Sequence, residues 1–77
     1  MGGTMDRATI EPAIRALITE IRSRLSEAAR IAGAAEACML AGSVAEGVTV
    51  SMDIEQLIYE AGRLHDAASL LNRLSRP

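Results

Sequence analysis

Apolar residues recur at steps of three and four along most of the chain, which is the spacing of one face of an α-helix. Polar residues lie on the face opposite a first series. A second series steps three-four-three-four-three, as in a coiled-coil seam. The first consists of Ile10, Ile14, Leu17, Ile21, Leu25, Ala28, Ala32, Ala35 and Met39, and the second consists of Ile54, Leu57, Ala61, Leu64, Ala68 and Leu71.

These series predict two long helices. The first is expected over about 9–46, with Thr9 as its N-cap, and the second over about 52–75, capped by Ser51. Between them, residues 47–51 are expected to form a turn, because glycine favours the position after a helix end and the β-branched run VTV interrupts the helical spacing. Residues 1–8 are expected to be a frayed leader.

Residues 31–45 are small or apolar on every side of a helical projection, interrupted only by Glu36 and Ser43. A helix of this kind is buried on more than one side, and its small residues let neighbouring helices approach closely. The sequence therefore predicts an all-α fold, an antiparallel helical hairpin that completes a helical bundle by association. A break near Gly33, giving three shorter helices, stays open, because glycine costs only about 1 kcal/mol in a helix interior.

A turn at 47–51 leaves the two predicted helices unequal in length. The first helix then extends beyond the second by roughly 20 Å, at ~1.5 Å per residue. Apolar residues concentrate on this overhang, and Ile18 widens the stripe. Leu70 and Leu74 add apolar surface on the second helix. We therefore predict a partner-binding surface formed by Ile10, Ile14, Leu17, Ile18, Ile21, Leu70 and Leu74.

Composition limits the means by which so short a chain can be stabilised. The 77 residues form one domain at most, and they include a single cysteine, Cys38, and a single histidine, His65. These exclude an intrachain disulfide and make a metal site improbable, so association with another chain is the remaining means. The partner is expected to be a helical protein, either a second copy or another chain, in a homo- or hetero-oligomer.

Charge argues against two other kinds of partner. Eight arginines against ten acidic residues give a net charge of −2, which is unlike a nucleic-acid-binding protein. Glu36 and Glu46 lie in or beside the alanine-rich run, where they oppose a membrane span. The start of the chain lacks the pattern of a secretory signal, and a cytoplasmic location is expected.

No motif in the sequence predicts catalysis or a cofactor. Glycine-rich phosphate loops, HExxH and GxSxG are absent. A di-iron Glu-x-x-His motif fails because Gly62 stands three residues before His65, which we expect to border the helix seam. Cys38 is expected to be a buried structural thiol. Tyr59, the only aromatic residue, is a candidate contact for a partner on the outer face of the second helix.

The second helix, SMDIEQLIYEAGRLHDAASLLNRLSR, carries an A-x-x-L-x-x-A/G-x-x-L-L pattern after a glutamine-containing start. The pattern consists of Ala61, Leu64, Ala67 or Ala68, Leu70 and Leu71. In this it resembles the small helical-hairpin co-chaperones of type III secretion needle subunits. The resemblance implies a non-enzymatic scaffold that pairs with a helical-repeat partner and holds the needle subunit unpolymerised in the cytoplasm.

Two other functional classes fit the same pattern. One is a self-sufficient homodimer, a Rop-like four-helix bundle with a regulatory role. The other is a helical accessory or antitoxin-like subunit of an unrelated protein. Each requires an exposed apolar stripe on the hairpin.

Overall fold

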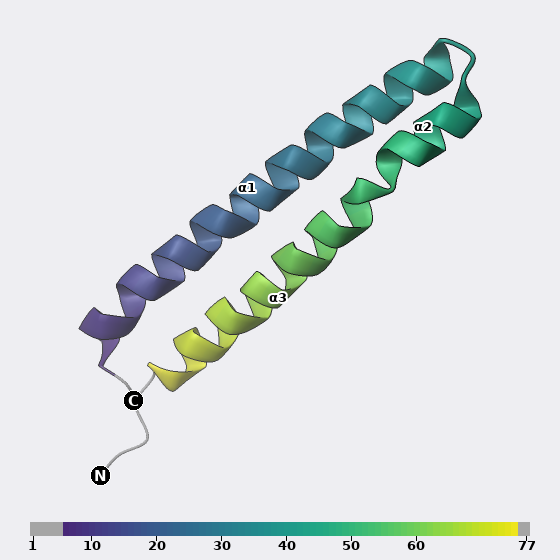
Figure 1. The fold of residues 1–77 in the computed structure, drawn as a ribbon. Helices are drawn as coiled ribbons and strands as arrows, with labels where there is room; N and C mark the ends of the chain where they lie inside the picture. Colours follow the sequence, from purple (N-terminus) through teal and green to yellow (C-terminus); the bar gives the residue numbers. More distant parts are fainter. Residues whose placement is uncertain (1–5, 76–77) are drawn as a thin grey trace.

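The chain forms two antiparallel helical arms joined by a tight turn (Figure 1). The computed structural model describes residues 6–75. Helix α1, Arg7–Leu40, forms the first arm, and α2, Val44–Ser51, and α3, Asp53–Leu74, follow each other along the second. The hairpin is a narrow rod, about 50 Å long along α1, and its Cα atoms span only 15 × 12 Å across. The predicted all-α antiparallel hairpin is confirmed.

The turn lies at residues 41–43 rather than at 47–51. Gly42 adopts a φ of +93°, which L-residues with side chains rarely adopt. Its N–H donates to the Met39 carbonyl at 3.0 Å, and the N–H of Ser43 donates to the Cys38 carbonyl at 2.9 Å. These two bonds form a Schellman motif and end α1 at Leu40, so the predicted end near residue 46 is wrong.

Helix α1 is continuous through Gly33, and the alternative with three shorter helices is therefore excluded. The break falls instead in the second arm, at Met52, between α2 and α3. Beside it, Thr49 Oγ1 donates to the Ala45 carbonyl at 3.2 Å and Ser51 Oγ to the Val48 carbonyl at 2.7 Å. Such bonds compete with the helical ladder and bend helices. Ser51 thus lies inside α2, and the prediction that it caps α3 is wrong.

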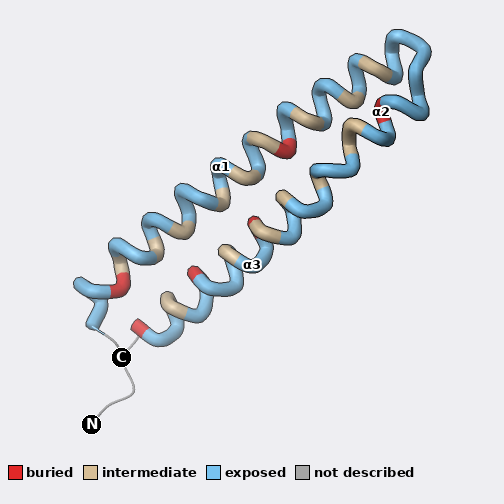
Figure 2. The backbone as a smooth tube through the Cα atoms, in the orientation of Figure 1, coloured by how far each residue is buried: buried red, intermediate tan, exposed pale blue. Residues whose placement is uncertain are grey.

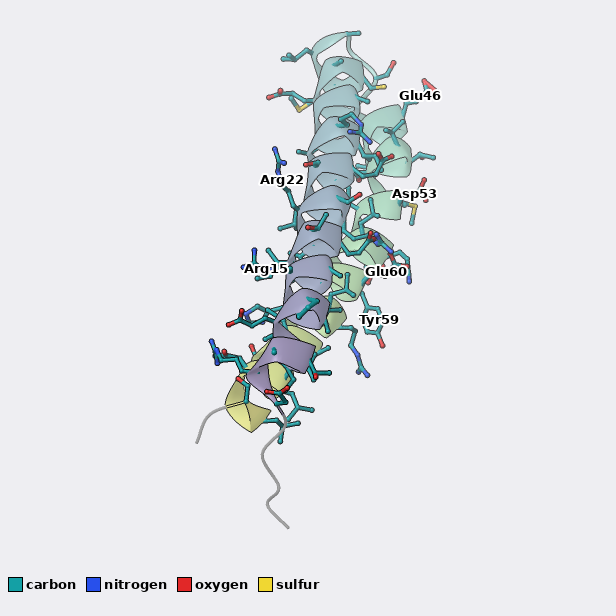
Figure 3. The ribbon with its side chains drawn as sticks, turned by 90° about the vertical axis from the view of Figure 1, so that its left-hand side faces the viewer. Arg15, Arg22, Glu46, Asp53, Tyr59 and Glu60 are labelled. Carbon is teal, nitrogen blue, oxygen red and sulfur yellow. The ribbon has the colours of Figure 1, made fainter. Side chains whose placement is uncertain are left out.

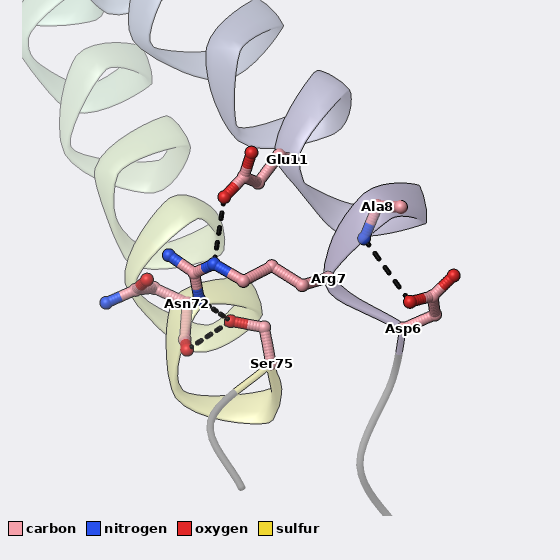
Figure 4. Close-up of polar contacts among 6 residues, drawn as sticks. All are labelled: Asp6, Arg7, Ala8, Glu11, Asn72 and Ser75. Atoms are coloured by element: carbon pink, nitrogen blue, oxygen red, sulfur yellow. Dashed lines mark hydrogen bonds and ion pairs between the residues drawn. The ribbon is translucent and has the colours of Figure 1, made fainter.

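Polar contacts tie the two open ends of the hairpin together (Figure 4). Asp6 rather than Thr9 is the N-cap of α1, and its side chain accepts a hydrogen bond from the Ala8 N–H. The Arg7 guanidinium donates to Ser75 Oγ at 2.8 Å, across the two arms. Of the predicted leader, residues 1–5 lie outside the described residues, and Arg7 and Ala8 are helical.

Moving the turn from 47–51 to 41–43 pairs each residue of the second arm with a residue of α1 about two heptads earlier than the predicted turn implies. Arg24 meets Glu60 at 2.9 Å, and the backbone of Gly47 lies against the Ala35 carbonyl. With the turn at 41–43 the arms are nearly equal in length, so the predicted overhang does not exist. Ile10, expected at its tip, is only 1% exposed.

The core is a single line of residues between the arms, here called the seam (Figure 2). Only Ile10, Ala28, Ala61 and Ala68 are buried hydrophobic residues of the described chain, and three of these are alanines. The seam consists of Ile10, Ile14, Leu17, Ile21, Arg24, Ala28, Ile31, Ala35 and Cys38 in the first arm, and of Gly47, Val50, Ile54, Leu57, Ala61, Leu64, Ala68, Leu71 and Ser75 in the second.

Candidate functional site

Large apolar side chains form a regular row along one flank of α1. Ile18, Leu25 and Met39, with Ala32 between them, are spaced by seven residues and by multiples of seven. Residues seven apart share one side of a helix that packs in a coiled-coil manner. Each follows directly after a seam residue, so the row borders the seam on one side. All three large side chains are 45–56% exposed.

The second arm continues this row with Val44, Val48 and Ile58, which are 50–60% exposed. In an antiparallel pair, residues that follow the second seam position of each heptad lie on the same side of both helices. Met39, Val44 and Val48 accordingly line one shallow groove near the turn, and Ile18 lines another with His65. We call this surface the apolar face; its members are Ile18, Leu25, Met39, Val44, Val48 and Ile58.

The opposite side of the hairpin carries carboxylates in the corresponding positions. Figure 3 shows Glu46, Asp53 and Glu60 projecting from one side, and Arg15 and Arg22 from the other. Glu27, Asp53 and Glu60 line a common groove there. We call this side the acidic face; its members are Glu20, Glu27, Glu46, Asp53 and Glu60.

A polar network crosses the seam on the acidic face. The Arg24 guanidinium donates to Glu20 at 2.5 Å and to Glu60 at 2.9 Å, and Gln56 donates to Glu60 at 3.0 Å. The bonds from Gln56 and then Arg24 hold the pKa of Glu60 below its ordinary value, and those to Glu20 and Glu60 raise the pKa of Arg24. No side-chain hydrogen bond between the arms covers the seam on the apolar face of the described chain.

The structure divides the seven predicted partner-binding residues among three places. Ile10 is buried within the hairpin, and Ile14, Leu17 and Ile21 are half-buried in the seam because α3 packs over them. Ile18 is exposed on the apolar face. Leu70 and Leu74 are exposed too, but they lie toward the acidic side of α3, away from Ile18.

Other residues considered from the sequence occupy less distinctive places. Cys38 is a half-buried seam residue near the turn, and His65 is exposed beside the seam. Tyr59 is 59% exposed, with the Arg63 guanidinium 6.0 Å from its ring centroid. Within residues 6–75, no group of three or more His, Cys, Asp or Glu side chains is arranged to hold a metal ion.

None of the helices in the described part of the chain combines the length and apolar character that a membrane span needs. Comparison with protein families, curated proteins and solved structures finds no match to this chain.

The sequence does not predict the apolar face, because two rows of α1 that differ by one residue both fit the seam. The pattern assigned Leu25, Ala32 and Met39 to the seam, whereas the structure places Arg24, Ile31 and Cys38 there. The seven-residue spacing from Ile18 to Leu25 to Met39 was the available signal. Residues seven apart share one side of a helix of this kind, so Leu25 and Met39 belong with Ile18, which borders the seam, rather than with the seam itself.

Proposed function

We propose that this chain is a non-enzymatic protein-interaction module whose apolar face docks a helical partner. The observation that carries the proposal is the row of six exposed apolar side chains along one side of a two-helix rod. A contiguous apolar surface, as opposed to scattered single residues, marks an interaction site. A straight row at helical spacing fits the side of another helix, which inserts its own residues between them.

The surface left exposed by the hairpin supports the same proposal. Among residues 6–75, only Ile10, Ala28, Ala61 and Ala68 are buried hydrophobic residues, so most apolar side chains of the rod stay accessible to a partner. The broad side of the rod, about 50 Å along α1 and 15 Å across, offers roughly 750 Å² of projected area. A standard interface buries about 800 Å² on each partner, so one docked helical partner is enough to cover this side.

A chaperone-like or adaptor-like role fits this mechanism, because a hairpin that is incomplete alone contributes two helices to a bundle formed with its target. The resemblance of the second arm to type III secretion co-chaperones, in Ala61, Leu64, Ala68 and Leu71, is compatible with such a role. Those four positions lie in the seam, however, and so hold the hairpin together. The proposed contact surface therefore rests on the apolar face alone.

Site-specific photo-crosslinking tests which side of the hairpin meets a partner. A photoreactive phenylalanine analogue is placed at Leu25 or Ile58 on the apolar face, and at Glu20 or Gln56 on the opposite side as matched controls. In cells that produce the chain, irradiation is expected to give a discrete adduct from the first two positions and none from the controls. Equal yields from both sides, or no adduct from any position, would contradict the proposal.

A further inference from the structure

Two charged residues stand beside the apolar face at matched positions. Arg15 and Glu36 lie three heptads apart on α1, at the position three residues before Ile18 and Met39 respectively. They therefore share one edge of the face, with Arg22 between them. Neither Arg15 nor Glu36 takes part in an ion pair among the described residues.

The two charges are placed almost symmetrically about Leu25. Arg15 lies ten residues before it and Glu36 eleven residues after it. A two-fold axis through the Leu25 level would set a second α1 antiparallel to the first. Arg15 of each copy would then lie beside Glu36 of the other, which gives two equivalent ion pairs at opposite ends of one interface.

The same axis brings two large apolar side chains, Leu25 and Ile58, to the centre of the contact. The Arg24–Glu60 pair puts Leu25 level with residues 58–59 of α3, so Leu25 would meet its own copy and Ile58 would meet its own copy. Ile18 would then oppose Ala32 of the second chain, a large residue against a small one. Because α1 spans Arg7–Leu40, an axis near its middle also leaves little of either rod uncovered.

The acidic face cannot serve two copies in this way. It carries five carboxylates, of which Glu46 and Asp53 belong to no ion pair in the described chain. Stacking this side on itself would bring like charges together, which disfavours association. Self-association is thus directed to the apolar face.

We infer that the occupant of the apolar face is a second copy of this chain, docked antiparallel to form a four-helix bundle. The inference rests on the proposed docking function and names its partner. In the bundle the apolar face of each copy covers the seam of the other. The Arg24 networks lie on the acidic faces, which stay on the outside.

Charge reversal tests the arrangement, using light scattering over a dilution series to obtain the dissociation constant of the dimer. Arg15→Glu and Glu36→Arg are each expected to weaken the dimer about tenfold, since each places like charges at both ends of the interface. The double variant Arg15→Glu/Glu36→Arg exchanges the two charges and is expected to restore the dissociation constant. Arg22→Glu is the control, because its counterpart across the axis is Ala29.

Cysteine crosslinking distinguishes this arrangement from a parallel dimer, in which the two turns lie together and α1 of each copy packs against α3 of the other. In a Cys38→Ser background, Leu25→Cys alone is expected to form a covalent dimer with a short thiol crosslinker. If Leu25→Cys crosslinks only when mixed with Ile58→Cys, or if the double charge variant stays weak, the antiparallel dimer is wrong. A chain that is monomeric throughout, yet photo-crosslinks from Leu25 to a different protein, overturns the inference and leaves the docking function standing. A monomer without any adduct overturns both.

Discussion

Single residues decide how closely the two arms approach each other near the turn. Gly47 is buried against α1, and a Cβ added there would lie 2.8 Å from the Ala35 carbonyl oxygen. That oxygen belongs to the backbone, so it can move away only if the helices separate. Gly33 and Gly62 have nothing within 4 Å of the same position. Replacing glycine by alanine is therefore expected to destabilise the fold at Gly47 and to stabilise it at Gly33 and Gly62.

Gly47→Ala is expected to destabilise the hairpin by about 1 kcal/mol, since overpacking of about 1–3 kcal/mol outweighs a gain in helix propensity of about 1 kcal/mol. Gly33→Ala, the matched control, receives only the gain and is expected to stabilise the chain by about 1 kcal/mol. Thermal unfolding measures both, with midpoint shifts of about 4–8 °C in opposite directions. Stabilisation by both substitutions would show that the arms do not approach as closely as described.

At the scale of the helices, the sequence was sufficient for the fold class and for the seam of the second arm. The series from Ile54 to Leu71 in the second arm lies between the arms as predicted. Its large residues at strict heptad spacing define a single face of the helix that can be buried. In the first arm the residues after Arg30 are small on every side, so the pattern does not select the buried face. The choice of Leu25 instead of Arg24 for the seam follows from that.

The predicted position of the turn, 47–51, is wrong, and the pairing of the two arms depends on it. Gly42 and Gly47 both fit the position after a helix end, and the VTV run after Gly47 made the second choice attractive. What distinguishes them is tertiary: Gly42 has a positive φ, whereas Gly47 is needed for close approach to Ala35. Moving the turn to residues 41–43 shifts the pairing and removes the predicted overhang, and the exposed apolar surface then lies along the side of the rod.

The network that joins α1 to α3 on the acidic face gives the fold a dependence on pH. The pKa of Glu60 is lowered in the folded chain, by Gln56 and then by Arg24. A carboxyl of this kind stabilises the fold above its unfolded pKa, and the contribution is lost as the pH falls through the lowered folded value. The loss therefore occurs below pH 4.5, the ordinary value for the group.

Glu60→Gln is accordingly expected to lower the melting temperature modestly at pH 7 and to melt like the unmodified chain at the acidic end of a titration. Glu55→Gln on the same helix is the control, since Glu55 belongs to no ion pair within residues 6–75. Thermal unfolding followed by circular dichroism between pH 7 and pH 3 makes the comparison. A constant difference between Glu60→Gln and the unmodified chain over that whole range would refute a role for the ionised carboxylate.

The whole molecule is a rod with two unlike sides. On the acidic face the Arg24 network crosses the seam, and on the apolar face no side-chain hydrogen bond between the arms crosses it within residues 6–75. The seam is composed largely of alanine and half-buried residues. Small domains of this kind generally require a disulfide, a metal or association. The single cysteine, Cys38, rules out the first within one chain, and the described residues contain no cluster suited to the second. We propose association through the apolar face as the means of stabilisation.

The most direct test is the molar mass of the purified chain and of two variants, measured by size-exclusion chromatography with light scattering over a dilution series. The unmodified chain is expected at twice 8.1 kDa down to low micromolar concentration. Leu25→Asp on the apolar face is expected to give a monomer, while Leu70→Asp, equally exposed on the other side, stays dimeric. A monomeric unmodified chain, or equal dissociation by both variants, would contradict docking of a second copy on the apolar face.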